Sequence, residues 1–99
     1  MPDRLPITPI GNVAFRAPAR VQGRVRSMRV TPFVDQPALE VVLVDETGGL
    51  LLVFFGRRQI PGIELSAQLE ATGVAGMHRG YLALVNPLYE HLPSIHGSH

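Results

Sequence analysis

Cysteine, lysine and tryptophan are all absent from this chain of 99 residues. Without cysteine the chain cannot form a disulfide, use a thiolate nucleophile or bind zinc or an iron–sulfur cluster through sulfur. Without lysine it can contain neither a P-loop lysine nor a Schiff-base nucleophile, and no Gly-x-Ser-x-Gly elbow is present. These absences argue against catalysis, and we predict that the protein is not an enzyme.

The carboxylates and histidines do not suggest a catalytic or metal site either. Asp45 and Glu46 are adjacent in a predicted turn, where two carboxylates need not converge on one substrate as an acid–base pair must. His78 and His91 are isolated, and His96 and His99 lie three residues apart near the end of the chain. We therefore predict no metal site and no cofactor.

Long hydrophobic runs are also missing. No apolar stretch approaches the roughly 18 to 20 residues that a membrane-spanning helix needs, and residues 1–10 do not resemble a signal peptide. Hydrophobic residues nevertheless make up 45% of the chain and charged residues 17%, which is enough apolar material for a core. We expect one soluble, cytoplasmic domain with no membrane partner.

The basic charge consists entirely of arginine, with nine residues and a net charge of only +1. Five arginines lie between residues 16 and 29, and Arg57 and Arg58 are adjacent. This clustering predicts a local basic face of the kind that contacts phosphates. A high-GC genome, which favours arginine codons, is an alternative explanation for the absence of lysine and accounts less well for the clustering.

Alternation of polar and apolar residues predicts a long first strand over residues 19–31. Val21, Gly23 and Val25 keep one phase, but Met28 and Val30 keep the other, so we expect a bulge near Ser27 that bends the strand around a small barrel. An ordinary edge strand is the alternative. Residues 31–37 contain two prolines and are predicted to form a loop that carries Phe33.

Residues 38–56 predict the clearest hairpin, with its turn at the sequence DETGG. The predicted inward residues are Leu39, Val41, Leu43, Leu50, Leu52 and Phe54, and the outward ones are Glu40, Val42, Val44, Leu51, Val53 and Phe55. Residues 57–65 contain Pro61 and Gly62, which limits them to a turn or one short helical segment. Residues 68–78 and 81–87 predict a last hairpin with Leu69, Ala71, Val74, Leu82 and Leu84 inward.

Five strands in this order are the parts of an all-β, five-stranded Greek-key OB-fold barrel. We assign it to residues 19–92, with an extended N-terminal arm over residues 1–18, a reduced helical link between the third and fourth strands, and a flexible tail over residues 93–99. Gly23, the stretch VDETGGL, the pair Phe54-Phe55 and the stretch VNPLYE together resemble nucleic-acid-binding OB-folds. The resemblance covers residues 19–90 and extends to the wedge domain of RecG-type helicases, the DNA-binding domains of replication protein A and small stand-alone OB-fold proteins of actinobacteria.

The resemblance implies a binding face on the second and third strands, flanked by the loops between strands one and two and between strands four and five. Phe55 matches the outward aromatic residue that stacks on bases in such domains. The predicted nucleic-acid-binding residues are Arg24, Arg26, Phe33, Phe55, Arg57, Arg58, His78 and Arg79. The expected partner is single-stranded DNA or RNA, bound with little sequence selectivity, and a helicase or repair protein is a possible second partner.

Alternatives remain for these residues. The outward Leu51, Val53 and Phe55 could instead form a homo-oligomer or protein-interaction surface, or Phe55 could pack under the N-terminal arm. Arg57 and Arg58 could simply form a solvated strand end. Asp45 and Thr47 are better explained as turn-forming residues than as ligands.

Overall fold

The computed structural model of the chain describes residues 5–93, and these fold into one six-stranded sheet without an α-helix among them. The predicted all-β class is therefore confirmed. A 3-10 turn, η1 (Ile10–Asn12), precedes the strands. The strands are β1 (Pro18–Phe33), β2 (Gln36–Asp45), β3 (Gly48–Phe55), β4 (Gln68–His78), β5 (Tyr81–Val85) and β6 (Leu88–His91).

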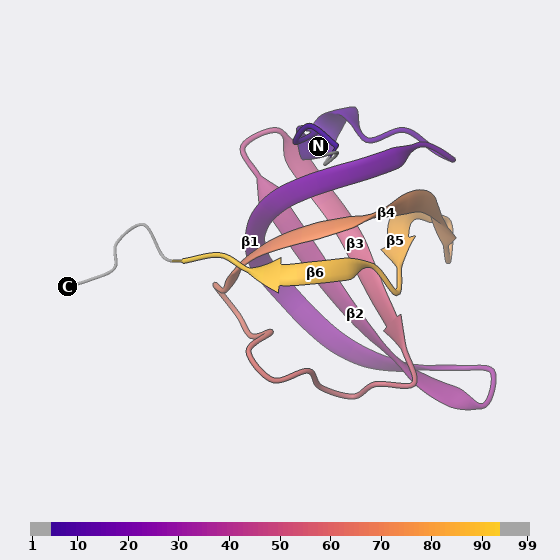
Figure 1. Ribbon diagram of the computed structural model, residues 1–99. Helices are drawn as coiled ribbons and strands as arrows, with labels where there is room; N and C mark the ends of the chain where they lie inside the picture. Colours follow the sequence, from indigo (N-terminus) through magenta and orange to yellow (C-terminus); the bar gives the residue numbers. More distant parts are fainter. Residues whose placement is uncertain (1–4, 94–99) are drawn as a thin grey trace.

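Five of the strands close into a ring because β1 pairs with a different strand at each of its ends. The order around the ring is β1-β2-β3-β5-β4, and β1 returns to pair with β4. Arg24 marks the change of partner, since it is opposite Val44 of β2 and also opposite Gln68 of β4. In Figure 1, β1 curves around the molecule and continues with β2 into a hairpin that projects beyond the ring.

The bend of β1 has the two causes that the sequence indicates. The register with β2 shifts between Val25 and Ser27, so the predicted bulge is confirmed. Gly23 lies so close to β2 that an added Cβ would be 2.5 Å from the carbonyl oxygen of Val44. Only glycine allows this close approach of two backbones without a shift.

The core lies inside the ring, and the central hairpin supplies most of it as predicted. All six inward residues predicted for β2 and β3 are buried, and they join Val21, Val25, Leu69 and Leu84 in one cluster. Burying each such aliphatic side chain contributes about 1.5–3 kcal/mol to folding. Met28 packs against this cluster, whereas Val30 is exposed on the projecting hairpin.

The predicted loop over residues 31–37 is wrong, because the β1–β2 pairing continues to a two-residue turn at Val34 and Asp35. Pro32 is opposite Pro37 in the register, one pair away from the turn. In a two-residue hairpin this second pair exchanges no backbone hydrogen bonds, so the missing N–H groups remove no bond from the β1–β2 pairing. The Pro37 carbonyl instead accepts a bond of 2.8 Å from the Gly56 N–H, on the side of β3.

The reduced helical link predicted between the third and fourth strands is also wrong. Residues 56–67 form isolated turns, in which the N–H of Ile63 binds the carbonyl of Ile60 and the N–H of Ala67 binds that of Glu64. Pro61 and Gly62 prevent the first turn from continuing as a helix, because Gly62 has a φ of +85°. Ile60 and Ile63 are nevertheless buried, so the link covers part of the core.

The last predicted strand, over residues 81–87, ends at Val85, and β6 follows it as a strand that was not predicted. β5 and β6 lie end to end along β4, separated by Asn86 and Pro87, so the sheet has six strands although the ring has five. The predicted hairpin turn at Arg79 and Gly80 is confirmed. The predicted inward position of Val74 is wrong: the residue is 63% exposed, because alternation along β4 buries Ala71 and Ala75 instead.

The described part of the N-terminal arm, residues 5–17, is held against the ring at several places, including backbone bonds of Arg16 and Ala17 with Ala75 of β4. The Thr8 N–H donates to the Arg20 carbonyl at 2.7 Å. At η1, the Ile10 N–H donates to Asp45 Oδ2 at 2.9 Å, and Ile10 is buried in the core. Asp45 Oδ1 also accepts bonds from Thr47, so Asp45 organises the β2–β3 turn as predicted. The predicted flexible tail lies almost wholly outside the described residues.

Candidate functional site

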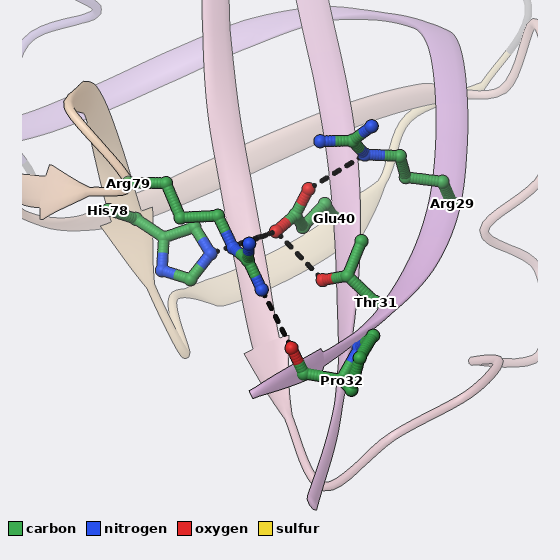
Figure 2. Close-up of polar contacts among 6 residues, drawn as sticks. All are labelled: Arg29, Thr31, Pro32, Glu40, His78 and Arg79. Carbon is green, nitrogen blue, oxygen red and sulfur yellow. Dashed lines mark hydrogen bonds and ion pairs between the residues drawn. The ribbon is translucent and has the colours of Figure 1, made fainter. Parts of the chain in front are cut away.

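The most unusual feature outside the core is a buried carboxylate, Glu40, which points away from the core on β2. Its side chain is only 4% exposed, and four side chains surround it. Arg29 Nε donates to Oε1 at 3.0 Å, and Thr31 Oγ1 donates to Oε2 at 3.0 Å. His78 Nε2 lies 2.9 Å and Arg79 Nε 3.3 Å from the same Oε2. Figure 2 shows Arg29 on one side of the carboxylate and His78 and Arg79 on the other.

The bulge in β1 is what brings Arg29 to this carboxylate. Arg24 is opposite Val44 and Arg29 is opposite Glu40, and these two β2 positions are four residues apart on one face of the strand. Arg24 and Arg29 are five residues apart, so a regular strand would place them on opposite faces. Because the bulge adds one residue, Arg26, both arginines lie on the same face as Glu40.

The environment of Glu40 keeps its carboxylate ionised. Burial is the largest single influence and raises the pKa, but the hydrogen bonds from His78, Arg29 and Thr31 together outweigh it and lower the pKa below its ordinary value of 4.5. Because an ionised carboxylate only accepts hydrogen bonds, Nε2 of His78 must carry the proton that the carboxylate receives. The buried polar groups of this network therefore satisfy one another.

Arg79 joins the β4–β5 hairpin to the end of β1. In addition to its contact with Glu40, its NH2 group donates to the Pro32 carbonyl at 2.7 Å (Figure 2). Arg79 and Gly80 have φ values of +52° and +86°, which is the left-handed pair of a type I′ turn. This tight turn fixes the position from which both His78 and Arg79 reach across to β1 and β2.

A cluster of rings lies beside the network. Phe33 and Phe55 are stacked, with centroids 4.9 Å apart and an angle of 29° between the rings. The ring of His78 lies 5.3 Å from that of Phe33 and 5.8 Å from that of Phe55. Phe33 and Phe55 are half-buried and pack against the fully buried Val53, together with Ala38 and Ala83. The outward face of β3 is therefore covered by the chain itself at this end.

A groove of about 620 Å³ lies next to the Glu40 network. Glu40, Arg29 and Arg79 form its polar end, and its other walls come from β1, β2, β3 and β5. Val42 and Leu51 contribute apolar surface, and Tyr81 is 69% exposed at the start of β5. The groove thus combines two guanidinium groups, an apolar wall and an accessible aromatic ring.

The structure brings together only some of the predicted site residues. Phe33, Phe55, His78 and Arg79 meet around Glu40, whereas Arg24 and Arg26 are exposed farther along β1. Arg57 and Arg58 are exposed beyond the end of β3. The depression that Arg58 lines also includes Val30, which points to the opposite face of the strand from its neighbour Arg29.

Sequence reasoning missed three members of the site, Arg29, Thr31 and Glu40. One signal was present, since Glu40 is the only charged residue in the otherwise apolar stretch ALEVVLV and alternation places it outward. A lone acid on a largely apolar face needs a partner, and Arg29 is the residue opposite it once the bulge is included. Tyr81 is not among the predicted nucleic-acid-binding residues either.

Comparison with known proteins does not extend these observations. No protein-family model matches the sequence, and no curated protein matches it. Within residues 5–93, no group of three or more potential metal ligands comes together. His96 and His99 lie outside the described residues. The same part of the chain contains no helix with the length and apolarity needed to cross a membrane.

Proposed function

We propose that this protein is an OB-fold domain that binds single-stranded DNA or RNA with little sequence selectivity. The arginine row on β1 is the observation that carries the proposal. Arg24, Arg26 and Arg29 are exposed, and the bulge directs Arg24 and Arg29 to one face. Three such charges along a strand suit the regularly spaced phosphates of an extended nucleic acid.

The architecture supports the OB-fold part of the proposal. Five strands form a ring in the order β1-β2-β3-β5-β4, and a long, bulged β1 pairs at both ends. The candidate groove lies against β2 and β3, between β1 and the β4–β5 hairpin. This is the side on which OB-folds bind oligonucleotides.

The contacts of Phe55 change the expected stacking residue. Phe55 is half-buried and already stacks on Phe33, so its ring has little free area for a base. Tyr81 lines the groove and is largely exposed. We therefore propose Tyr81 as the residue on which a base stacks, and assign Phe33 and Phe55 to supporting the groove wall.

The same contacts weaken the proposal of a protein-interaction surface built from Leu51, Val53 and Phe55. Val53 is fully buried, and Leu51 and Phe55 pack around it in the second apolar cluster. Little of this face is left for another chain. The apolar character of the outward side of β3 is explained by packing within the domain.

Fluorescence anisotropy with labelled single strands of mixed sequence, measured across a salt series, tests the proposal. If about three arginines neutralise phosphates, the plot of log K against log salt should have a slope near −2. Arg24→Gln with Arg26→Gln should make this slope shallower by about 1.4. Tyr81→Ala should weaken binding about 5- to 150-fold, the loss expected for one stacked base, with the slope unchanged.

Arg57→Gln with Arg58→Gln is the matched control, because it removes the same charge from another part of the surface. We expect this variant to retain a slope close to that of the wild type. Equal effects of the two double substitutions would show that binding depends on net charge and not on the β1 row. No binding at low salt would refute the proposed function.

A further inference from the structure

Building on the proposed function, we propose that the groove is an end site, which accepts a terminal nucleotide bearing a phosphomonoester. Its phosphate would contact Arg29 and Arg79, and its base would lie along the apolar wall toward Tyr81. The ligand class is thus a nucleotide with a free phosphate, either at the end of a strand or as a mononucleotide. The proposal depends on the geometry of the Glu40 network.

Glu40 orients the two guanidinium groups but does not use all of their donors. Arg29 binds Glu40 through Nε alone and its side chain is 70% exposed, so its two terminal nitrogens have no hydrogen-bond partner among the described residues. Arg79 uses Nε and NH2, which leaves NH1 without a partner among the described residues. Fixed guanidinium groups with free N–H donors are well suited to binding phosphate oxygens.

The charge at this end of the groove favours a monoester over a diester. Arg29, Arg79 and Glu40 together carry a net charge of about +1 when His78 is neutral. A phosphomonoester carries a charge of about −1.5 to −2 near pH 7, whereas the diester of an internal nucleotide carries one negative charge. A terminal phosphate therefore gains more from this pair of arginines than an internal phosphate does.

Side-chain contacts also cross the polar end of the groove. The contacts of Arg79 with Glu40 and the Pro32 carbonyl connect the β4–β5 hairpin to β2 and β1. Phe33 and Phe55 lie outside the groove lining, beside His78. An internal nucleotide needs space for its backbone to enter and to leave, but a terminal nucleotide needs only one opening. The volume of about 620 Å³ is in the range of small-ligand sites.

The test compares short DNA strands of one sequence that carry a 5′-phosphate, a 3′-phosphate or hydroxyl groups at both ends, together with a circular strand. Unlabelled strands and mononucleoside 5′- and 3′-monophosphates compete with a labelled strand or are titrated calorimetrically. We expect at least one phosphorylated end to bind about ten-fold more tightly than the hydroxyl-ended and circular strands.

Arg29→Lys is the informative variant because it keeps the charge and removes the planar fork. It should reduce the ten-fold preference to about three-fold or less while the salt slope stays the same. Arg16→Lys, at an exposed position outside the groove lining, is the matched control and should retain the full preference. Circular dichroism establishes that both variants are folded.

The outcomes separate this inference from the proposed function. Equal binding of circular, hydroxyl-ended and phosphorylated strands refutes the end site but leaves single-strand binding intact. Binding of a mononucleotide that Arg29→Lys weakens, without binding of any strand, supports the phosphate site and refutes the proposed function. If neither strands nor mononucleotides bind, both are refuted.

Discussion

Replacing Glu40 by glutamine is the most direct test of the buried network. Glutamine has nearly the same shape, but it is neutral, and its amide nitrogen is a donor where glutamate had an acceptor. The substitution cannot preserve all four contacts, because the Oε2 atom of Glu40 alone faces Thr31, His78 and Arg79. In one orientation the amide nitrogen of glutamine takes the place of Oε2 and faces Thr31, His78 and Arg79. In the other it takes the place of Oε1 and leaves Arg29 unpaired.

The expected loss of stability follows from the burial of each partner. His78 is buried and would lose a charge-assisted hydrogen bond, which costs about 1.5–3 kcal/mol. Thr31 adds up to about 1 kcal/mol. Arg29 and Arg79 are substantially exposed and can be hydrated again, so their ion pairs contribute little each. We expect the free energy of unfolding to fall by about 2–4 kcal/mol, less than the full cost of breaking a buried pair.

Thermal and urea unfolding followed by circular dichroism measures this loss. A decrease of about 2–4 kcal/mol should lower the Tm by roughly 10–25 °C in a domain of this size. Glu46→Gln, at an exposed position in the β2–β3 turn, is the matched control and should change the stability by less than about 0.5 kcal/mol. A loss no larger for Glu40→Gln than for Glu46→Gln would contradict our account of the network.

The stabilities of the wild type and of Glu40→Gln should also depend differently on pH. The folded-state pKa of Glu40 is below its ordinary value of 4.5, so its ionised form stabilises the fold above that value. This contribution is lost as the pH falls below 4.5 and through the lowered pKa. The wild type should therefore lose stability on acidification, and Glu40→Gln should lose less. Parallel pH profiles of the two proteins would be inconsistent with a lowered pKa of Glu40.

Three further substitutions test individual features of the fold. Val34→Gly should raise the stability by about 0.5–1 kcal/mol in urea unfolding, because this 85% exposed, β-branched residue has a φ of +58°; a loss would contradict backbone strain there. Gly23→Ala should cost about 2 kcal/mol or more, since its Cβ would meet the Val44 carbonyl, and a neutral result would show that β1 can move away from β2. Asp45→Ala should cost about 2 kcal/mol and speed hydrogen exchange at the Ile10 amide; unchanged exchange there would mean that Asp45 does not hold the arm.

The sequence was most informative where one strand face is buried and the other is not. The inward set of the β2–β3 hairpin was predicted without error because alternation identifies the inward face of β2. Continuing that register across the turn then identifies the inward face of β3, whose residues are all apolar. The bulge in β1 was predictable for the same reason, since two apolar phases separated by one residue cannot otherwise face one core. Val74 was wrongly placed inward because the prediction departed from strict alternation along β4. It chose Val74, which has the larger apolar side chain, instead of Ala75.

Other errors arose from features that residue types alone do not determine. Two prolines argued against a strand at residues 32–37. A proline in a strand loses a hydrogen bond only where its nitrogen faces a neighbouring strand that needs a donor, and the register decides where that is. The network was missed for a similar reason. Arg29 and Glu40 are opposite one another only after the bulge is counted, and His78 and Arg79 arrive from a hairpin 38 or more residues later.

The network also explains why a candidate nucleic-acid site contains a buried acid. An acid on a phosphate-binding face ordinarily weakens binding by repulsion, so Glu40 would be unfavourable if it were exposed or alone. Here its charge is shared by Arg29 and Arg79, whose unused donors reach the groove beside it. Removing the carboxylate would increase the local positive charge but release both guanidinium groups from fixed positions. Glu40→Gln should therefore strengthen binding of all strands at low salt while reducing discrimination between phosphorylated and hydroxyl ends, a combination that simple charge neutralisation does not predict.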